Sequence, residues 1–178
     1  QNITREDQDD FAVASYKRAL AATESGVFAK EIVPIEVVSQ RSITTLDIDE
    51  EPQRFNEEKL RALKAAFVKD GSVTAGNASS INDGAASVLV QSKEAAEATG
   101  SKPQVRVLGY ATYSREPEWF TLAPIGAIQK LLDYLDLAVP DIDLFEINEA
   151  FSAVALAAMK SLEIPHDKVN VHGGAVAL

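Results

Sequence analysis

Strand-like and helical segments alternate through the second half of the sequence. They are, in chain order, an alternating apolar and polar stretch at 104–113, a helical pattern at 124–135, an apolar run at 144–148 and a helical pattern at 149–162. Strands joined by helices form a largely parallel sheet with right-handed crossovers, because a parallel pair needs a long connection between its strands. The order therefore predicts an α/β fold.

The first half carries clear helix signals and one candidate edge strand. Thr4 and Asp7 have the spacing of a capping box, which predicts a helix over 4–22. The extended segment 31–38 contains Pro34, which has no amide hydrogen, so we expect it at a sheet edge. The further predicted elements are an exposed loop at 39–56, a helix at 60–67, a strand at 85–90, a helix at 92–98 and a break at 100–103 between two similar halves.

Charge and composition exclude several classes of partner. The 178 residues include 17 basic and 27 acidic side chains and carry a net charge of −10, so no broad surface for nucleic-acid phosphates is expected. No apolar run reaches the roughly 20 residues that span a bilayer, so we expect no membrane partner. Since the sequence has no cysteine, it can form neither a disulfide framework nor a thiolate metal site.

Three segments together resemble the thiolase family. They are GSVTAGNASSINDGAA at 71–86, FEINEAFSAVAL at 145–156 and VNVHGGAVAL at 169–178, in the order and at about the spacing of that family. The resemblance covers essentially the whole chain. It implies a thiolase-like fold, in which two similar α/β halves stack in α/β/α/β/α layers, only partly present in this chain. It places residues 1–78 in the loop region that covers the CoA site, 79–101 in the last segment of the N-terminal half and 102–178 at the start of the C-terminal half.

The resemblance also implies a reaction. Thiolases transfer an acetyl group between CoA thioesters, reversibly converting two acetyl-CoA molecules to acetoacetyl-CoA and CoA, through an acyl-cysteine and without a covalent cofactor. The sequences NAS at 77–79 and DEEP at 49–52 favour this short-chain reaction over that of a long-chain 3-ketoacyl-CoA thiolase of fatty-acid breakdown. Acyl-CoA substrates are therefore the expected partners, and a homodimer or homotetramer is implied for the full-length protein.

The chain also departs from the family pattern. Thiolases carry a nucleophilic cysteine in the N-terminal half and a histidine in a GHP motif after the GGA segment. This chain has no cysteine and stops just before the position of that histidine. We therefore expect a fragment of a longer enzyme, and the alternative is a catalytically inactive CoA-binding fragment or subunit. A cytoplasmic location is expected, with the mitochondrial matrix as the alternative.

Asn148 is the candidate catalytic residue. By resemblance, its amide holds a water that donates into the oxyanion hole for the enolate of the substrate. The alternative is that Asn148 only caps the following helix. For Glu149 the alternatives are a first-turn acid favoured by the helix dipole and a residue that orders the polar network of the site.

Small and aromatic residues are expected around the pantetheine arm of CoA. Ser79 resembles the family residue that hydrogen-bonds the pantetheine, and the alternative is a turn serine that bonds its own backbone. The residues that would line the same tunnel are Ala75, Gly76, Ala78, Ala150 and Phe151.

The nucleotide end of CoA is expected near residues 54–59. Arg54 and Lys59 would supply local positive charge and Asn56 would meet the base, whereas the alternative is an ordinary solvated helix start. Tyr16 corresponds to a tyrosine that binds potassium in one subgroup of the family, and the alternative is a member of an apolar helix face.

The histidines are not expected to act in catalysis. His172 lies beside the glycine pair, and it is not the family's catalytic histidine, which would come later. His166 follows a proline and is expected to be exposed. Two isolated histidines without a carboxylate at ligand spacing do not predict a metal site.

Overall fold

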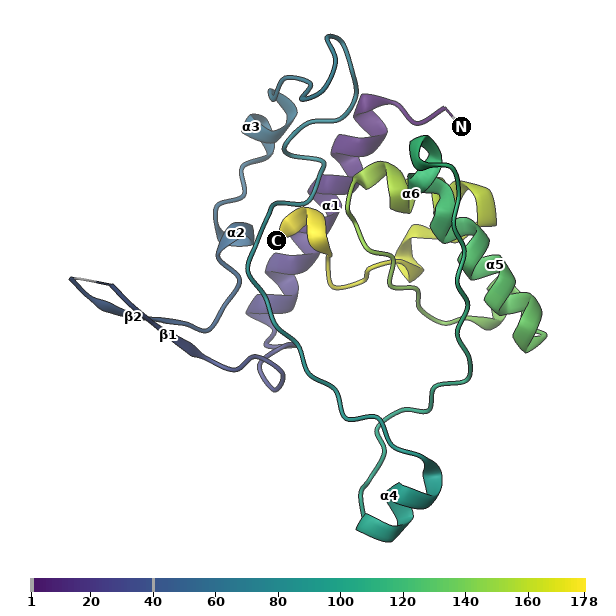
Figure 1. Cartoon of the computed structure of the whole chain (residues 1–178). Coiled ribbons are helices and arrows are strands. Elements are labelled where there is room, and N and C mark those ends of the chain that lie inside the picture. Colours follow the sequence, from purple (N-terminus) through teal and green to yellow (C-terminus); the bar gives the residue numbers. More distant parts are fainter. Residues whose placement is uncertain (1, 40) are drawn as a thin grey trace.

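The structure is a computed structural model that describes residues 2–39 and 41–178 (Figure 1). The helices are α1 Arg5–Glu24, α2 Glu50–Gln53, α3 Glu57–Arg61, α4 Lys93–Thr99, α5 Ala123–Leu135 and α6 Ser152–Leu162. The strands are β1 Ile35–Val38 and β2 Ile43–Leu46, and the short 3-10 turns are η1 Pro117–Leu122, η2 Val139–Asp141, η3 His166–Lys168 and η4 Ala175–Ala177. Among these described residues, no helix is long and apolar enough to cross a bilayer.

Helix α1 begins at the capping box that the sequence predicts. The Thr4 hydroxyl accepts a hydrogen bond from the Asp7 amide at 3.1 Å, and the Thr4 amide donates to the Asp7 carboxylate at 2.8 Å. The box satisfies two amides that have no partner inside the helix. Beyond the helix the chain turns at Gly26, whose φ of 69° suits a residue without a side chain. The predicted helix over 4–22 is therefore confirmed.

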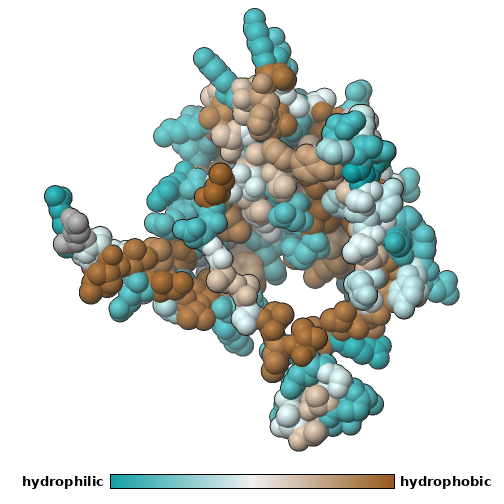
Figure 2. All heavy atoms as spheres, in the orientation of Figure 1, coloured by the Kyte–Doolittle hydropathy of each residue, from teal (hydrophilic) through white to brown (hydrophobic). Residues whose placement is uncertain are grey.

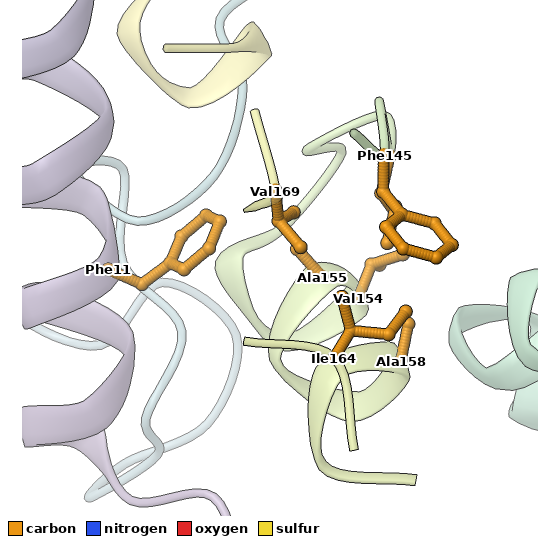
Figure 3. Close-up of a cluster of buried hydrophobic side chains, with 8 residues drawn as sticks. Phe11, Phe145, Val154, Ala155, Ala158, Ile164 and Val169 are labelled. Atoms are coloured by element: carbon orange, nitrogen blue, oxygen red, sulfur yellow. The ribbon is translucent and has the colours of Figure 1, made fainter. Parts of the chain in front are cut away.

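Two clusters of buried side chains join α1 to segments from the far end of the chain. The first, shown in Figure 3, has the buried members Phe11, Phe145, Ile147, Val154, Ala155, Ala158, Ile164 and Val169. The buried members of the second are Ala12, Val13, Tyr16, Ala19, Leu60, Val176 and Ala177. Burying a large apolar side chain contributes roughly 1.5–3 kcal/mol. We call α1, α6, the loop 72–79 and the segments 145–151 and 164–177 the compact unit.

The predicted strand at 144–148 forms one short parallel pairing inside this unit. The Phe145 amide donates to the Lys168 carbonyl at 2.8 Å, and the Asn170 amide donates to the Phe145 carbonyl at 2.9 Å. Phe145 is thereby bridged to Val169 in parallel. The helix predicted over 149–162 begins only at Ser152, because the residue before it is extended and pairs with another loop.

The segments predicted as strands at 85–90 and 104–113 do not form strands. Among the described residues, no backbone hydrogen bond joins either segment to another part of the chain. Apolar alternation alone does not make a strand, because each strand needs a partner for its amides and carbonyls. Figure 1 shows residues 81–108 leaving the body of the molecule and returning to it, with α4 at the turning point. We call residues 81–108 the arm.

The three other helix predictions have different outcomes. Helix α4 confirms the helix predicted at 92–98, with a hydrogen bond from the Ala95 amide to the Ser92 hydroxyl at its start and left-handed Gly100 at its end. Helix α5 confirms the helix predicted at 124–135. The helix predicted at 60–67 is wrong beyond Arg61, because the chain turns and the Ala66 amide donates to the Val73 carbonyl instead.

The strands β1 and β2 form an antiparallel hairpin that projects from the body (Figure 1). Strand β1 lies in the predicted extended segment, but β2 and α2 fall within 39–56, so the prediction of a loop there is wrong. The β-branched run at 43–45 pairs with β1, which explains the difference. Figure 2 shows the hairpin as a largely hydrophobic projection, and all residues of both strands are exposed.

Candidate active site

The loop 72–79 is held in shape by a buried asparagine. The Asn77 amide oxygen accepts from the Thr74 amide at 2.8 Å, and the Asn77 amide nitrogen donates to the Asp9 carboxylate at 2.9 Å and to the Ser72 carbonyl at 3.0 Å. Asp9 in turn pairs with Arg5 at 2.7 Å. Because Asn77 is fully buried, these bonds tie the loop firmly to α1.

A short antiparallel strip joins this loop to the segment 148–152. The Ser152 amide donates to the Asn77 carbonyl at 2.9 Å, and the Ser79 amide donates to the Ala150 carbonyl at 3.2 Å. The Ser79 hydroxyl also donates to that Ala150 carbonyl, at 3.4 Å, so the alternative of a turn serine bonding its own backbone is wrong. Ala78 is bridged to Phe151. The structure thus brings together Ser79, Ala78, Ala150 and Phe151, which the sequence predicts at one site.

The remaining small residues of the loop have different surroundings. Ala75 is exposed, whereas Gly76 is buried against helix α3. A Cβ atom on Gly76 would lie 2.8 Å from the Leu60 side chain and 2.9 Å from that of Leu63. The small size of Gly76 is therefore required by packing against these leucines.

Asn148 faces an apolar hollow of about 460 Å³. The hollow lies between the segments 120–128 and 146–154, and Phe120, Pro124, Ile128 and Val154 supply much of its apolar wall. The Asn148 side chain is exposed and makes no hydrogen bond with any described residue. Helix α6 begins at Ser152 without a side-chain cap, so the alternative that Asn148 caps this helix is wrong.

Glu149 is the centre of a buried polar network. Its side chain is 1% exposed and accepts hydrogen bonds from the Ser15 hydroxyl at 2.7 Å, the Asn170 amide at 2.8 Å and the Val176 backbone amide at 3.1 Å. Three donors compensate the carboxylate for the loss of water. Glu149 lies before the first turn of α6, so the helix-dipole alternative is wrong and the network alternative holds.

Gly174 makes room for this carboxylate. A Cβ atom at position 174 would lie 2.5 Å from the Glu149 carboxyl carbon and 2.7 Å from each of its oxygens. The Gly174 amide donates to the Ser15 hydroxyl at 3.0 Å, which links the glycine turn to α1. Ser15 and Asn170 also belong to the site, although no local sequence pattern links them to Glu149.

A second carboxylate, Glu146, lines the hollow beside Asn148. Partial burial raises the pKa of Glu146, the negative charge of Glu149 raises it further, and His172 opposes both effects. Glu146 is therefore easier to protonate than a freely solvated glutamate.

The residues expected at the nucleotide end of CoA lie on the α2–α3 segment. Arg54 is exposed and pairs with Glu50 at 3.5 Å and with Glu51 at 3.6 Å. The Asn56 side chain caps α3 by accepting from the Lys59 amide at 2.9 Å, as in the helix-start alternative, and the Lys59 side chain is exposed. None of these residues lines the hollow that contains Asn148.

Tyr16 belongs to the second buried cluster. Its ring stacks on Phe55 with centroids 4.7 Å apart, as the apolar-face alternative predicts. Burial raises the pKa of the Tyr16 hydroxyl, and the charge of Glu51 adds to the effect. Potassium binding at Tyr16 stays a prediction.

The two histidines have different environments. His166 is half-buried and stacks on Phe11 with centroids 5.2 Å apart, so the expectation that it is exposed is wrong. Burial lowers the pKa of His166, and the nearby charge of Arg18 lowers it further. His172 is exposed and meets the Phe28 ring edge-on at 5.9 Å. In the part of the chain that the structure describes, no three His, Cys, Asp or Glu residues form a metal-binding group.

Family models and relatives of known sequence match nearly the whole chain. Residues 1–94 match the family described as the thiolase N-terminal domain, and residues 101–178 match the thiolase C-terminal domain. An acetyl-CoA acetyltransferase of Yarrowia lipolytica is 49% identical over 176 residues, covering 99% of this chain and 44% of that protein. A cytosolic acetyl-CoA acetyltransferase of Gibberella zeae is 47% identical over 179 residues, covering 99% of this chain and 45% of that protein.

Solved structures are also similar to this chain over nearly its whole length. The Bacillus anthracis acetyl-CoA acetyltransferase superposes with a TM-score of 0.94 at 46% identity, and the human mitochondrial 3-ketoacyl-CoA thiolase with a TM-score of 0.93 at 40% identity. Both superpositions cover 99% of this chain and 45% of the other, so the chain spans less than half the length of these relatives. The thiolase-like fold expected from the motifs is confirmed. Two matching family domains in the family's order and this shared fold show that the chain belongs to the thiolase family.

Proposed function

We propose that this chain forms the part of an acetyl-CoA acetyltransferase that binds acyl-CoA and stabilises the enolate. The observation that carries the proposal is the position of Asn148. Its amide faces an apolar hollow without a hydrogen bond to any residue that the structure describes, next to the strip that joins Ser79 to Ala150. Relatives that are 47–49% identical and named acetyl-CoA acetyltransferases support this choice of reaction. The substrates are acetyl-CoA and acetoacetyl-CoA, and no covalent cofactor takes part.

The reaction proceeds through an acyl-cysteine in the full-length protein. A cysteine thiolate attacks the carbonyl of one acetyl-CoA and expels the CoA thiolate, which is then protonated. A second acetyl-CoA gives a proton from its α carbon to a general base and becomes the enolate. The resulting enolate carbon attacks the acyl-cysteine carbonyl, which forms acetoacetyl-CoA and frees the cysteine. Since these 178 residues contain no cysteine, the nucleophile comes from another part of the full-length protein or from a partner.

The contribution of this chain is binding and charge stabilisation. Asn148 provides an amide on a well-held backbone segment that, with a bound water, donates to the enolate oxygen, and a donor placed in this way acts most strongly on the transition state. Phe151 forms an aromatic wall for the pantetheine arm with Phe67 and Phe120, whose ring centroids are 6.4 Å and 6.3 Å from its own. We propose that the arm runs along this wall toward Ser79, and that Arg54 and Lys59 attract the CoA phosphates.

Replacing Asn148 by alanine in the full-length protein tests the proposal. We expect kcat for acetoacetyl-CoA cleavage to fall roughly 100- to 1000-fold, because one preorganised donor is lost, with a Michaelis constant within about threefold of the original. Asn2→Ala, at an exposed asparagine outside the hollow, should leave both constants unchanged. An unchanged kcat for Asn148→Ala would refute the assignment.

A long-chain 3-ketoacyl-CoA thiolase is the second candidate. It is supported by the likeness to the human mitochondrial 3-ketoacyl-CoA thiolase, with a TM-score of 0.93. Rates measured with acyl chains of increasing length separate the two reactions, since the acetyltransferase should lose activity beyond the four-carbon substrate.

A catalytically inactive CoA-binding subunit is the third candidate. The intact mass of the polypeptide from its natural source tests it, because a mass near 19.1 kDa would describe a chain without a nucleophile and a mass about twice as large would favour the enzyme. For the full-length enzyme we further propose a homodimer or homotetramer and a cytoplasmic location. Within this chain we propose that residues 1–78 cover the CoA site, that 79–101 end the N-terminal half and that 102–178 begin the C-terminal half.

A further inference from the structure

The direction of the Asn148 amide depends on its neighbours in the chain. The Asn148 side chain is exposed and has no hydrogen bond to a described residue, whereas Ile147 before it is 6% exposed and Glu149 after it is 1% exposed. The backbone on either side fixes the direction in which the Asn148 side chain leaves the chain toward the hollow. The contacts that hold Ile147 and Glu149 therefore set the place from which the Asn148 side chain projects.

Asn170 contacts both of these neighbours. Its amide oxygen accepts from the Ile147 backbone amide at 2.8 Å, and its amide nitrogen donates to the Ile147 carbonyl at 2.8 Å and to the Glu149 carboxylate at 2.8 Å. An asparagine amide offers one acceptor and two donors, and all three are used here. All three bonds are buried, so their loss would leave polar groups without partners.

We propose that Asn170 is a positioning residue for the reaction, because its amide holds the residues before and after Asn148 and so fixes the backbone from which the Asn148 side chain projects into the hollow. The proposal rests on the function proposed above. Asn170 lies behind the segment that carries Asn148 and does not line the hollow, so it acts through Asn148 without touching the substrate. A misplacement of about 1 Å at a reacting group can lower a rate by roughly 100-fold.

The backbone around Asn170 is itself fixed. Asn170 has a φ of 47°, a left-handed conformation that asparagine tolerates better than most residues. Arg18 of α1 donates to the Val169 carbonyl at 2.7 Å and to the Asn170 carbonyl at 3.4 Å. The Gly173 amide donates to the Asn170 carbonyl at 3.0 Å. These contacts allow the Asn170 amide to serve as a rigid support.

The test uses the full-length protein and the variant Asn170→Gly. Glycine keeps the left-handed backbone and removes the whole side chain, so the loss of the side-chain bonds is separated from backbone strain. We expect kcat to fall roughly 10- to 100-fold, with a Michaelis constant for acetyl-CoA within about threefold of the original. Val169→Ala is the matched control, because it lowers stability in the same segment without removing a polar group, and it should leave kcat within about threefold.

Should Asn170→Gly not fold, Asn170→Asp replaces it in the same assay. Aspartate has the same size and keeps the acceptor for the Ile147 amide, but it loses both donors and faces Glu149 with a second acid. The same fall in kcat is expected from it.

Combining each variant with Asn148→Ala decides whether Asn170 acts through Asn148. In the Asn148→Ala protein, we expect Asn170→Gly to lower kcat by less than about threefold, since the group that it positions is already gone. The inference would be overturned if Asn170→Gly lowered kcat by its full factor in the Asn148→Ala protein as well. It would also be overturned if Asn170→Gly alone had a normal kcat while Asn148→Ala was impaired. Either result would leave the proposed function intact. A normal kcat for Asn148→Ala alone would overturn both.

Discussion

The compact unit and the arm contain similar apolar residues in opposite environments. Val169 in the compact unit is fully buried, whereas Val88 and Val105 in the arm are 85% and 83% exposed. In the compact unit, α1, α6 and the last residues of the chain cover one another, whereas the arm returns to the body without a covering layer (Figure 1). An apolar pattern therefore predicts which side chains can be buried, but a strand forms only where another segment pairs with it.

The arm nevertheless has a definite course. The superposition on the Bacillus anthracis enzyme covers 99% of this chain with a TM-score of 0.94, so the arm is included. Its extended segments thus follow the path of the corresponding segments in a protein of about twice the length.

Hydrogen exchange should show the largest difference between the two regions. In the 178-residue chain, the amides at 85–90 and 104–108 have no backbone partner among the described residues, whereas those of α6 are bonded within a helix that contributes to the core. We expect the arm amides to exchange near the rate of an unfolded peptide and the central amides of α6 to exchange at least about 100-fold more slowly. Comparable protection of both regions would mean that the arm is paired in solution.

Two glycine substitutions test whether the two regions differ in packing. Gly174→Ala places a methyl group 2.5 Å from the Glu149 carboxyl carbon, whereas a Cβ atom at Gly84 in the arm would meet nothing within 4 Å. We expect Gly174→Ala to lower the free energy of unfolding by about 2–3 kcal/mol and Gly84→Ala to change it by less than about 0.5 kcal/mol. Denaturant unfolding of the 178-residue chain measures both. Equal effects would show that the two regions do not differ in packing.

The pH dependence of stability should reflect His166 of the compact unit. Its pKa is lowered from 6.5 by burial first and by Arg18 second, so the unfolded chain binds more protons than the folded one near and below that pH. The favourable contribution of neutral His166 is therefore present above pH 6.5 and is lost as the pH falls through the folded-state pKa.

His166→Phe, which keeps a ring against Phe11, should make unfolding less dependent on pH between about 7 and 5. His172 is exposed, so His172→Phe is the control. The free energy of unfolding of this variant should depend on pH as it does in the parent chain. If the free energy of unfolding of His166→Phe depended on pH as steeply as that of the parent chain, the pH dependence could not be assigned to His166.

Arg54→Ala should have the smallest effect on stability. Both ion pairs of Arg54 are solvent-exposed, so we expect the free energy of unfolding to change by less than about 0.5 kcal/mol. In the full-length protein, the Michaelis constant for CoA should rise roughly three- to tenfold at low salt, because one positive charge near the phosphates is lost. An unchanged constant at low salt would remove Arg54 from the proposed CoA site.

Sequence patterns predicted the features that depend on neighbours in the chain. The Thr4 capping box and the left-handed Gly100 are local signals, and both mark helix ends in the structure. The motifs that carry Ser79 and Asn148 gave the family and the candidate site, and the structure places Ser79 beside Ala150.

The features that sequence patterns missed depend on distant partners. Ser15 meets Glu149 across 134 positions and Asn77 meets Asp9 across 68, and neither serine nor asparagine has a local pattern that predicts such a bond. The proline before His166 predicts an exposed loop residue, but His166 is half-buried because its ring stacks on Phe11. Side-chain networks of this kind become visible only when the fold is known.

The contacts of Arg18 also affect how the chain is made. Arg18 donates to the carbonyls of His166 and Val169, which follow it by 148 and 151 positions. At a synthesis rate of roughly 5–20 residues per second, α1 leaves the ribosome roughly 8–30 s before these partners exist. During that interval its apolar face is uncovered and open to chaperones. The capping box involves only Thr4 and the first turn of α1, so these hydrogen bonds are available to the nascent helix before its distant partners exist.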